Sequence, residues 1–245
     1  MIDDDDDIGE ADGEAEAEWW DYDTAEEMAE AVAGDVAFII ESALDARGEA
    51  LVALPGGNTP LPIYEKLKAV KLKWKYVTIF PGDDRLVAVD NPLSNVAMLA
   101  KTFLPLGGRV VPIGSASLGV KQAGDAAEAR LRDLKWPPDL VWLGVGGDGH
   151  TASIFPGPDY EEALTSKRLA IGVTPDPLPA EAPVPRVTLT RSAILSARAI
   201  MFTLSGAAKR KVLEKAIAQG AKSPYPVGRL LADIDQPIDI HWSAK

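Results

Sequence analysis

The chain has 245 residues and a formal net charge of −12, with 25 lysines and arginines against 37 aspartates and glutamates. This balance argues against nucleic acid as a partner, because nucleic-acid phosphates select basic surfaces. A small anionic substrate stays possible, since surface charges are screened over about 8 Å at physiological ionic strength. Hydrophobic residues make up 47% of the chain, which is sufficient for a sizeable core.

The sequence also constrains the compartment. It contains no cysteine, so disulfides and thiolate metal sites are excluded and a reducing compartment is favoured. No apolar run approaches the roughly 18 residues of a membrane span, and the acidic start is the reverse of a signal peptide. We therefore expect a cytoplasmic protein that does not contact a membrane.

The chain divides into two regions by composition. Residues 1–18 are acidic and of low complexity, with five consecutive aspartates, and we expect a disordered tail because like charges repel. Five aspartates can attract a divalent cation, but a solvated tail is the preferred interpretation. Residues 19–245 show no break in composition and no internal repeat, and we expect them to form a single α/β domain.

Capping signals and apolar periodicity predict alternating helices and strands. Asp23 or Thr24 caps a helix that runs to about residue 46 and is ended by Gly48. Further helices are predicted at 61–70, 95–104, 124–134, 192–196 and 207–218, with a turn or helix at 227–231. Strands are predicted at 50–54, 76–80, 140–145, 169–173, 186–190, 199–204 and 238–242, with loops and one short strand at 106–120 and a proline-rich loop at 174–185. This alternation predicts a mainly parallel sheet with helices on both faces, a Rossmann-like three-layer α/β sandwich.

The most informative segment is DLVWLGVGGDGHTASIFPG at 139–157. The run 140–145 is typical of a buried strand in a parallel sheet. A glycine-rich turn with polar side chains follows, and open α/β sheets bind their ligands at such turns. His150 is one of two histidines and the only one in such a turn, so we interpret it as the chemical centre; the alternative is a structural turn histidine. His241, in the last predicted strand, is interpreted as structural.

Gly144, Gly146 and Gly149 also satisfy the G-x-G-x-x-G fingerprint of dinucleotide sites. That fingerprint requires a long helix at the third glycine and an acidic residue about twenty positions later. Pro156 and Pro158 end any such helix early. We therefore predict no dinucleotide site.

A second glycine turn, Gly56-Gly57-Asn58-Thr59, follows the predicted strand at 50–54. Glycines let the backbone turn sharply close to a ligand, and we predict Thr59 as N-cap and Pro60 as the first helical residue. A strand, a glycine turn and a helix N-terminus together offer free N–H groups to an anion. An ordinary βα turn has the same residue preferences, but anion binding is the favoured interpretation.

Two further positions carry charges that suit a sugar phosphate. Asp83, Asp84 and Arg85 follow the strand at 76–80 and suit acid–base work or a sugar-phosphate contact, although a solvated turn with one salt bridge explains them equally well. Lys209 lies in the first turn of the helix at 207–218, where a lysine opposes the helix dipole. An anionic ligand explains that placement, and so does simple exposure.

These turns together resemble the glucosamine-6-phosphate isomerase/6-phosphogluconolactonase family of sugar-phosphate enzymes. The matches occur in family order and extend the resemblance over about 19–242. They are LPGGNTP at 54–60, DDR at 83–85 with Ser94-Asn95, GVGGDGHTASIFP at 144–156 and, more weakly, RVTLT at 186–190 and Ser205-Gly206 with Lys209.

Within the family, the lactonase branch fits better than the deaminase branch. Lactonase histidine turns typically read DGHTASLFP and deaminase turns DGHIAFNEP, against DGHTASIFP here. Arg85 is typical of the lactonases, where deaminases carry tyrosine. Asp84 replaces the usual glutamate, which leaves its contact open, and Ala88 stands where proline is common.

The resemblance implies hydrolysis of 6-phospho-D-glucono-1,5-lactone, in the oxidative pentose phosphate pathway, by a monomer or weak homo-oligomer. His150 would be the base, since histidine ordinarily titrates near pH 6.5, with Asp148 or Asp83 orienting it and N–H groups of 146–149 stabilising the oxyanion. No nucleophilic serine is expected, because the G-x-S-x-G motif is absent. A lactone is an activated ester, so the implied hydrolysis needs no metal and no cofactor. The residues expected to bind substrate are Gly56, Gly57, Asn58, Thr59, Arg85, Asn95, Gly147, Arg186 and Lys209.

Two rival functions stay open. One is an isomerase or deaminase on the same scaffold, with Asp83 as the base that removes a proton from carbon. The other is a sugar-phosphate sensor without catalysis, although no DNA-binding module is visible in the sequence for such a regulator.

Overall fold

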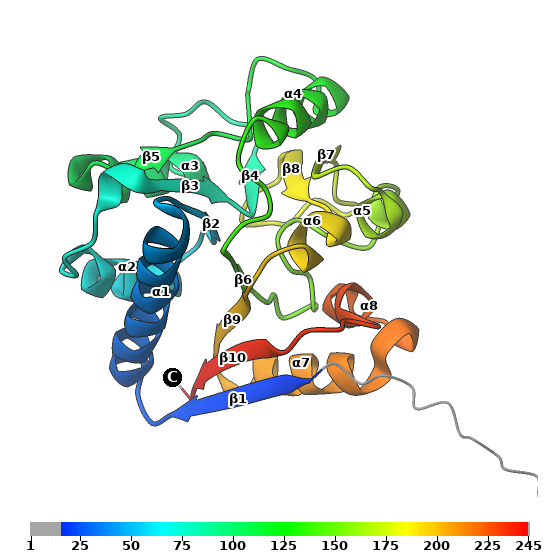
Figure 1. Ribbon diagram of the computed structural model, residues 1–245. Helices are drawn as coiled ribbons and strands as arrows, with labels where there is room; N and C mark the ends of the chain where they lie inside the picture. Colours follow the sequence, from blue (N-terminus) through cyan, green and yellow to red (C-terminus); the bar gives the residue numbers. More distant parts are fainter. Residues whose placement is uncertain (1–15, 245) are drawn as a thin grey trace, which may run out of the picture.

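A computed structural model describes residues 16–244 of the chain (Figure 1). Most of the predicted acidic tail, residues 1–15, lies outside this range. The first strand, β1, spans Ala17–Tyr22 and so begins two residues before the predicted domain start at Trp19. Sequence analysis missed this strand because it forms by pairing with the last strand, at the other end of the chain.

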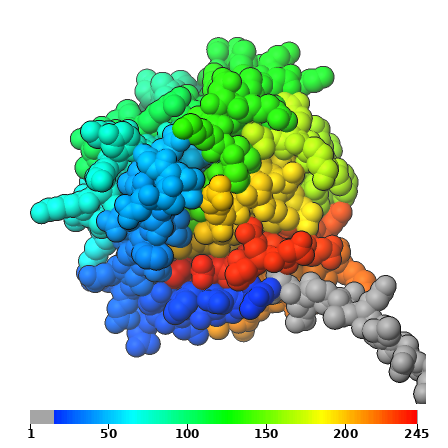
Figure 2. All heavy atoms as spheres, viewed as in Figure 1, coloured from blue at the N-terminus to red at the C-terminus, as the bar shows by residue number. Residues whose placement is uncertain are grey.

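Seven parallel strands form the central sheet in the order β1-β10-β9-β6-β2-β3-β5, which confirms the predicted mainly parallel sheet. Figure 2 shows both ends of the described chain at one side of the molecule, where β1 (blue) runs along β10 (red). Besides β1, the strands are β2 (Ala50–Leu54), β3 (Val77–Pro81), β5 (Arg109–Val110), β6 (Leu140–Gly144), β9 (Ile200–Ser205) and β10 (Ile238–Ser243).

Helices cover both faces of the sheet, as predicted. The α-helices are α1 (Ala25–Arg47), α2 (Pro60–Lys68), α3 (Asn95–Phe103), α4 (Val120–Arg132), α5 (Tyr160–Thr165), α6 (Arg191–Leu195), α7 (Ala207–Gln219) and α8 (Pro226–Leu231), and 3-10 turns lie at Trp74–Tyr76, Leu104–Leu106 and Gly220–Lys222. The first three pack on one face, and the others lie on the opposite side (Figure 1). None of the helices between residues 16 and 244 is both long and apolar enough to cross a membrane.

Strand β6 shows why the sheet is buried on both faces. Leu140 and Trp142 point into the core beneath α1, α2 and α3, whereas Val141 and Leu143 point into the opposite core. Side chains alternate between the two faces of a strand, so a strand between two cores must be apolar at every position. This requirement explains the continuous apolar run at residues 140–145 of the sequence.

Helix α1 follows its capping signals closely. The Thr24 hydroxyl accepts a hydrogen bond from the Glu27 backbone N–H, and the Glu27 carboxylate accepts one from the Thr24 N–H in return, which completes a capping box. Gly48 ends the helix with φ 76°. Two other helices differ from expectation: α4 begins at Val120 rather than at 124, and α5 was not predicted because Pro156 and Pro158 were interpreted only as a stop.

A second, antiparallel sheet lies beside the central one, with strand order β4-β8-β7. It consists of β4 (Asp83–Arg85), β7 (Ala170–Val173) and β8 (Arg186–Leu189). No strand was predicted at residues 83–85, and the alternative of a solvated turn there was wrong, since Asp84 is buried. Three charged residues carry no strand signal of their own, and β4 exists because it pairs with β8 about a hundred residues later. This pairing brings Asp83, Arg85 and Arg186 together.

Candidate active site

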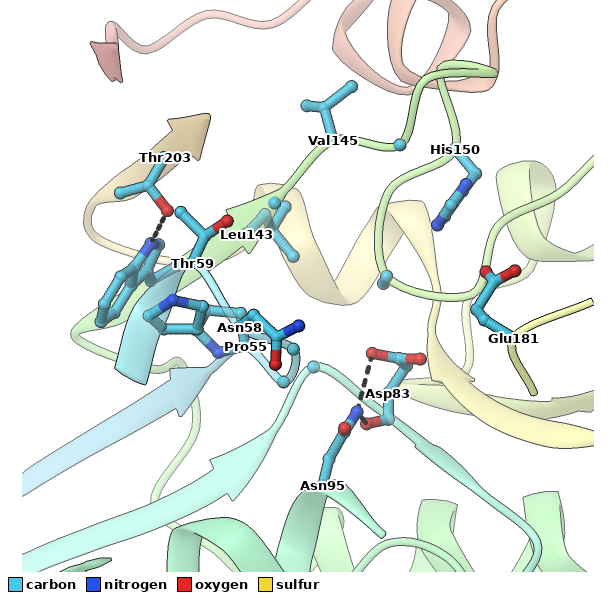
Figure 3. Close-up of a pocket in the computed structure, with 18 of the residues that line it drawn as sticks. Pro55, Asn58, Thr59, Asp83, Asn95, Leu143, Val145, His150, Glu181 and Thr203 are labelled. Carbon is cyan, nitrogen blue, oxygen red and sulfur yellow. Dashed lines mark hydrogen bonds between the residues drawn. The ribbon is translucent and has the colours of Figure 1, made fainter. Parts of the chain in front are cut away.

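A cleft of about 360 Å³ opens at the C-terminal ends of β2, β3, β6 and β9 (Figure 3). The chain leaves β2 toward β3 and leaves β6 toward β9, so the connections of these neighbouring strands diverge. Divergent connections leave a crevice, which is where open α/β sheets bind ligands. Of the predicted site residues, Asp148 alone does not line the cleft; those that do are Gly56, Gly57, Asn58, Thr59, Asp83, Arg85, Asn95, Gly147, His150, Arg186 and Lys209.

His150 points into the cleft from the turn after β6 (Figure 3). Its Nδ1 lies 2.5 Å from Oδ1 of Asp148, and the same oxygen accepts a hydrogen bond from the His150 backbone N–H at 3.2 Å. The hydrogen bond with the imidazole is the main cause that lowers the pKa of Asp148. Nε2 of His150 has no hydrogen-bond partner among residues 16–244, so it is available to a ligand. Of the two carboxylates predicted as partners, Asp148 makes the contact and Asp83 does not.

Two glycines of the turn are required by close packing. A Cβ on Gly146 would lie 2.2 Å from Nδ1 and Cε1 of His150, so any side chain there would displace the imidazole. Gly149 has φ 79°, and a Cβ there would also lie 2.6 Å from Cβ of Tyr225. No helix opens at Gly149, since α5 begins only at Tyr160. Gly146 therefore leaves room for the imidazole and Gly149 for Tyr225, and the turn lacks the helix that the dinucleotide fingerprint requires at its third glycine.

Asp83 lies in the same cleft and is held from two directions (Figure 3). Its Oδ2 accepts a hydrogen bond from the Ser153 hydroxyl at 2.5 Å. The side-chain amide of Asn95 donates to the Asp83 carbonyl at 2.8 Å and reaches Oδ1 at 3.4 Å. The carboxylate is thus fixed between the histidine turn and the start of α3.

Asp84 points away from the cleft into the protein. It is 1% exposed, and its carboxylate accepts hydrogen bonds from the backbone N–H groups of Asn95 at 2.7 Å, Arg85 at 2.9 Å and Val96 at 3.3 Å. Burial raises its pKa to about 6, although these backbone bonds act in the opposite direction. Asp84, which replaces the glutamate usual in the family, therefore contacts the N-terminus of α3. A negative charge is favourable at that end of a helix.

Three cations line the cleft. Arg85, Arg186 and Lys209 form no ion pair with any residue between 16 and 244. Arg186 is 2% exposed, and Nε of both arginines is buried without a hydrogen-bond partner among the described residues. Burial is the main cause that lowers the pKa of the Arg186 guanidinium, and Arg85 contributes in the same direction. Arg85 donates to Oδ1 of Asn95 and to the Leu93 carbonyl, and Arg186 donates to the Ala182 carbonyl, but neither guanidinium has an ion-pair partner among the described residues. A buried charge without an opposite charge is unfavourable, so the positive charge of this cleft is suited to an anionic ligand.

The glycine turn before α2 completes one wall of the cleft. Thr59 occupies the N-cap position, but the prediction that its side chain caps the helix was wrong. Its backbone is itself helical, with φ −58° and ψ −41°, so the hydroxyl makes no capping bond and lines the cleft instead (Figure 3). Lys209 lies in the first turn of α7, as predicted.

Sequence reasoning missed several residues of the site. Glu181 reaches the cleft from the proline-rich loop, where no periodicity marks a single acidic residue (Figure 3). Trp142 lines the cleft and donates a hydrogen bond from Nε1 to the Thr203 hydroxyl at 2.9 Å. Phe155 stacks on His150 with ring centroids 4.1 Å apart. Its position in the same turn as His150 was the sequence signal for this contact.

Comparisons with known proteins agree with this geometry. Residues 23–240 match the family model of glucosamine-6-phosphate isomerases/6-phosphogluconolactonase. Similar proteins include a 6-phosphogluconolactonase of Mesorhizobium japonicum, 34% identical over 92% of this chain and 94% of its own length, and one of Rhizobium meliloti, 36% identical over 88% and 94%. A 6-phosphogluconolactonase structure from Shewanella baltica superposes with a TM-score of 0.86 at 31% identity, covering 94% of this chain and 98% of that one. The chain therefore belongs to the glucosamine-6-phosphate isomerase/6-phosphogluconolactonase family.

Proposed function

We propose that this protein hydrolyses 6-phospho-D-glucono-1,5-lactone to 6-phosphogluconate, the second step of the oxidative pentose phosphate pathway. The observation that carries the proposal is a carboxylate-bound histidine in a cleft whose cations have no ion-pair partner among residues 16–244. The similar proteins named above support the same activity. We further propose that the enzyme works in the cytoplasm, a reducing compartment that fits a sequence without cysteine. We propose that it is a monomer or a weak homo-oligomer.

His150 is the proposed general base. Its Nε2 takes a proton from a water molecule as the water oxygen attacks the lactone carbonyl carbon. Asp148 holds Nδ1 and stabilises the imidazolium that forms, as the carboxylate of a triad does. When the bond between C1 and the ring oxygen breaks, the imidazolium returns the proton to that oxygen, which becomes the 5-hydroxyl of the product. A general base of this kind typically contributes about 10²–10⁴ in rate.

The backbone of the histidine turn is the proposed oxyanion site. Gly146 N–H donates to the His150 carbonyl at 2.9 Å and Gly149 N–H to the Gly146 carbonyl at 3.0 Å, so both donors are already used. Gly147 lines the cleft, and its N–H has no partner among the described residues. We therefore assign the developing negative charge to Gly147 N–H, because a fixed donor stabilises it without reorganisation.

The phosphate is the proposed partner of the cleft cations. Arg85, Arg186 and Lys209 supply positive charge, and the turn at Gly57–Thr59 supplies backbone N–H groups at the start of α2. Binding the phosphate, which lies far from the scissile bond, aligns the lactone carbonyl with the water. The same contacts explain why an acidic protein accepts an anionic substrate.

The test is a rate measurement on the purified protein. Glucose-6-phosphate dehydrogenase makes the lactone in situ, and formation of 6-phosphogluconate is compared with the spontaneous rate. We expect clear acceleration, and no ammonia or fructose 6-phosphate from glucosamine 6-phosphate. Release of either product would favour the isomerase or deaminase function. Tight 6-phosphogluconate binding without acceleration would favour a sensor.

A further inference from the structure

Phe155 bridges the histidine turn and a buried cation. Its ring stacks on the His150 imidazole with centroids 4.1 Å apart and an interplanar angle of 23°. The Cζ atom of Arg186 lies over the same phenyl ring, 5.0 Å from its centroid. One aromatic side chain thus contacts both the proposed base and the most deeply buried cation of the cleft.

The other contacts of His150 do not fix the tilt of the imidazole ring. The Asp148 hydrogen bond fixes the position of Nδ1 but permits the imidazole to tilt about that contact, since the terminal torsion of histidine is broad. Gly146 packs against the Nδ1 and Cε1 edge of the ring. Stacking on Phe155 is the contact that sets the plane of the ring, and with it the direction of Nε2.

Arg186 restricts the movement of the Phe155 ring through its contact with the ring face. The guanidinium is 2% exposed, and its Nη2 donates to the Ala182 carbonyl at 3.1 Å, so it cannot swing away into solvent. Aromatic faces attract cations, and they attract an imidazolium for the same reason. The phenyl ring can therefore stabilise the imidazolium that forms on His150 during the reaction.

We propose that Phe155 is a positioning residue that holds the imidazole of His150 in the plane from which Nε2 reaches the attacking water. This inference rests on the proposed lactonase activity for its kinetic consequence but not for the stacking itself. It predicts that an aromatic ring is needed at this position, rather than apolar bulk alone.

The experiment compares Phe155→Leu, which keeps apolar volume, with Phe155→Tyr, which keeps the ring. For Leu we expect kcat to fall about tenfold, part of the contribution of a general base, with KM within about twofold of wild type. For Tyr we expect at least half of the wild-type kcat. A Leu variant with wild-type kcat, or a Tyr variant as slow as Leu, would overturn the proposal.

A second readout does not depend on activity. The chain has two histidines, so the His150 ring signals can be assigned in a carbon–proton NMR spectrum by their loss in His150→Asn. We expect Phe155→Leu to move these signals by the lost ring current, while His241 signals stay in place and thermal unfolding shows a folded protein. Unmoved His150 signals would contradict the stacking. A protein that lacks lactonase activity but shows the shift would refute the proposed function alone.

Discussion

Arg85 and Arg186 occupy directly opposed positions in the antiparallel pair of β4 and β8. Like charges directly opposite one another destabilise a strand pair, and each of these guanidinium groups also has a buried Nε without a partner among residues 16–244. Arg85 donates to the Leu93 carbonyl and Arg186 to the Ala182 carbonyl, but these bonds leave both positive charges without an opposite charge among the described residues. In the proposed function, a bound phosphate would reduce this repulsion and accept hydrogen bonds from the two guanidinium groups.

Ligand binding should therefore raise the stability of the protein through this pair. We expect 6-phosphogluconate at about 100 times its Kd to stabilise wild type by about 2.7 kcal/mol. Arg186→Gln should weaken binding about tenfold or more, because a hydrogen bond to a charged group contributes about 1.5–3 kcal/mol. Thermal unfolding with and without ligand measures this. Arg109→Gln, an exposed arginine outside the cleft, is the control; equal ligand shifts in both variants would refute the assignment.

Asp148 should support catalysis through the negative charge that its carboxylate places beside Nδ1 of His150. Asp148→Asn keeps the shape of the side chain but removes that charge, and we expect kcat to fall about tenfold or more while KM changes little. Steady-state kinetics test this, with the exposed Asp45→Asn on α1 as a control of equal charge change. A kcat equal to that of the control would mean that Asp148 only shapes the turn.

Arg210 ties the start of α7 to the first and last strands. It pairs with Asp21 at 2.5 Å and Glu214 at 2.7 Å, and its Cζ lies 4.8 Å from the Trp19 ring centroid and 4.6 Å from that of Trp242. We expect Arg210→Met to reduce the free energy of unfolding by about 1–2 kcal/mol, mostly through lost cation–π contacts. Urea denaturation measures it.

A control variant and a kinetic measurement test the role of Arg210 further. Lys211→Met changes an exposed cation of the same helix and should leave stability within about 0.5 kcal/mol of wild type. Since Lys209 lies in the same first turn as Arg210, the Arg210 variant should also raise KM more than it lowers kcat. Wild-type stability in Arg210→Met would show that the Arg210 contacts do not help to hold β1.

His241 makes stability depend on pH. It is 1% exposed, its Nδ1 lies 3.0 Å from the Tyr22 hydroxyl, and burial lowers its pKa to about 4. The unfolded chain gains this proton near pH 6.5 while the folded one does not. The contribution is therefore complete above about pH 6.5 and is lost as pH falls toward 4, by at most about 3 kcal/mol.

Asp84 acts in the opposite direction over nearly the same range. Its pKa of about 6 exceeds the ordinary value of 3.8, so the folded protein keeps this proton and gains stability as pH falls from about 6 to 4. Wild type alone cannot separate the two groups. Urea unfolding at several pH values should show that the stability advantage of wild type over His241→Gln shrinks from pH 6.5 to 4.5. A constant advantage would mean that His241 does not stay neutral in the fold.

The sequence predicted the parallel sheet and the turns that line the cleft because both have local signals. Glycines, prolines and a histidine after an apolar run mark a strand end wherever the strand lies. Strands β1 and β4 have no such signal, since each forms only by pairing with a distant strand. Thr59 departs from the local rule that a threonine before a helix caps it, because its hydroxyl lines the cleft and makes no capping bond to α2.

The most direct test of the mechanism is lactone hydrolysis by wild type and by His150→Asn, with substrate made in situ and the spontaneous rate subtracted. Asparagine keeps a polar side chain but cannot accept the proton of the attacking water. Our mechanism predicts rapid turnover by wild type and a loss of about a hundredfold or more in the variant, the low end of what a general base contributes. Equal rates for the two proteins would contradict the role of His150, and a wild-type rate no faster than the spontaneous reaction would contradict the lactonase function itself.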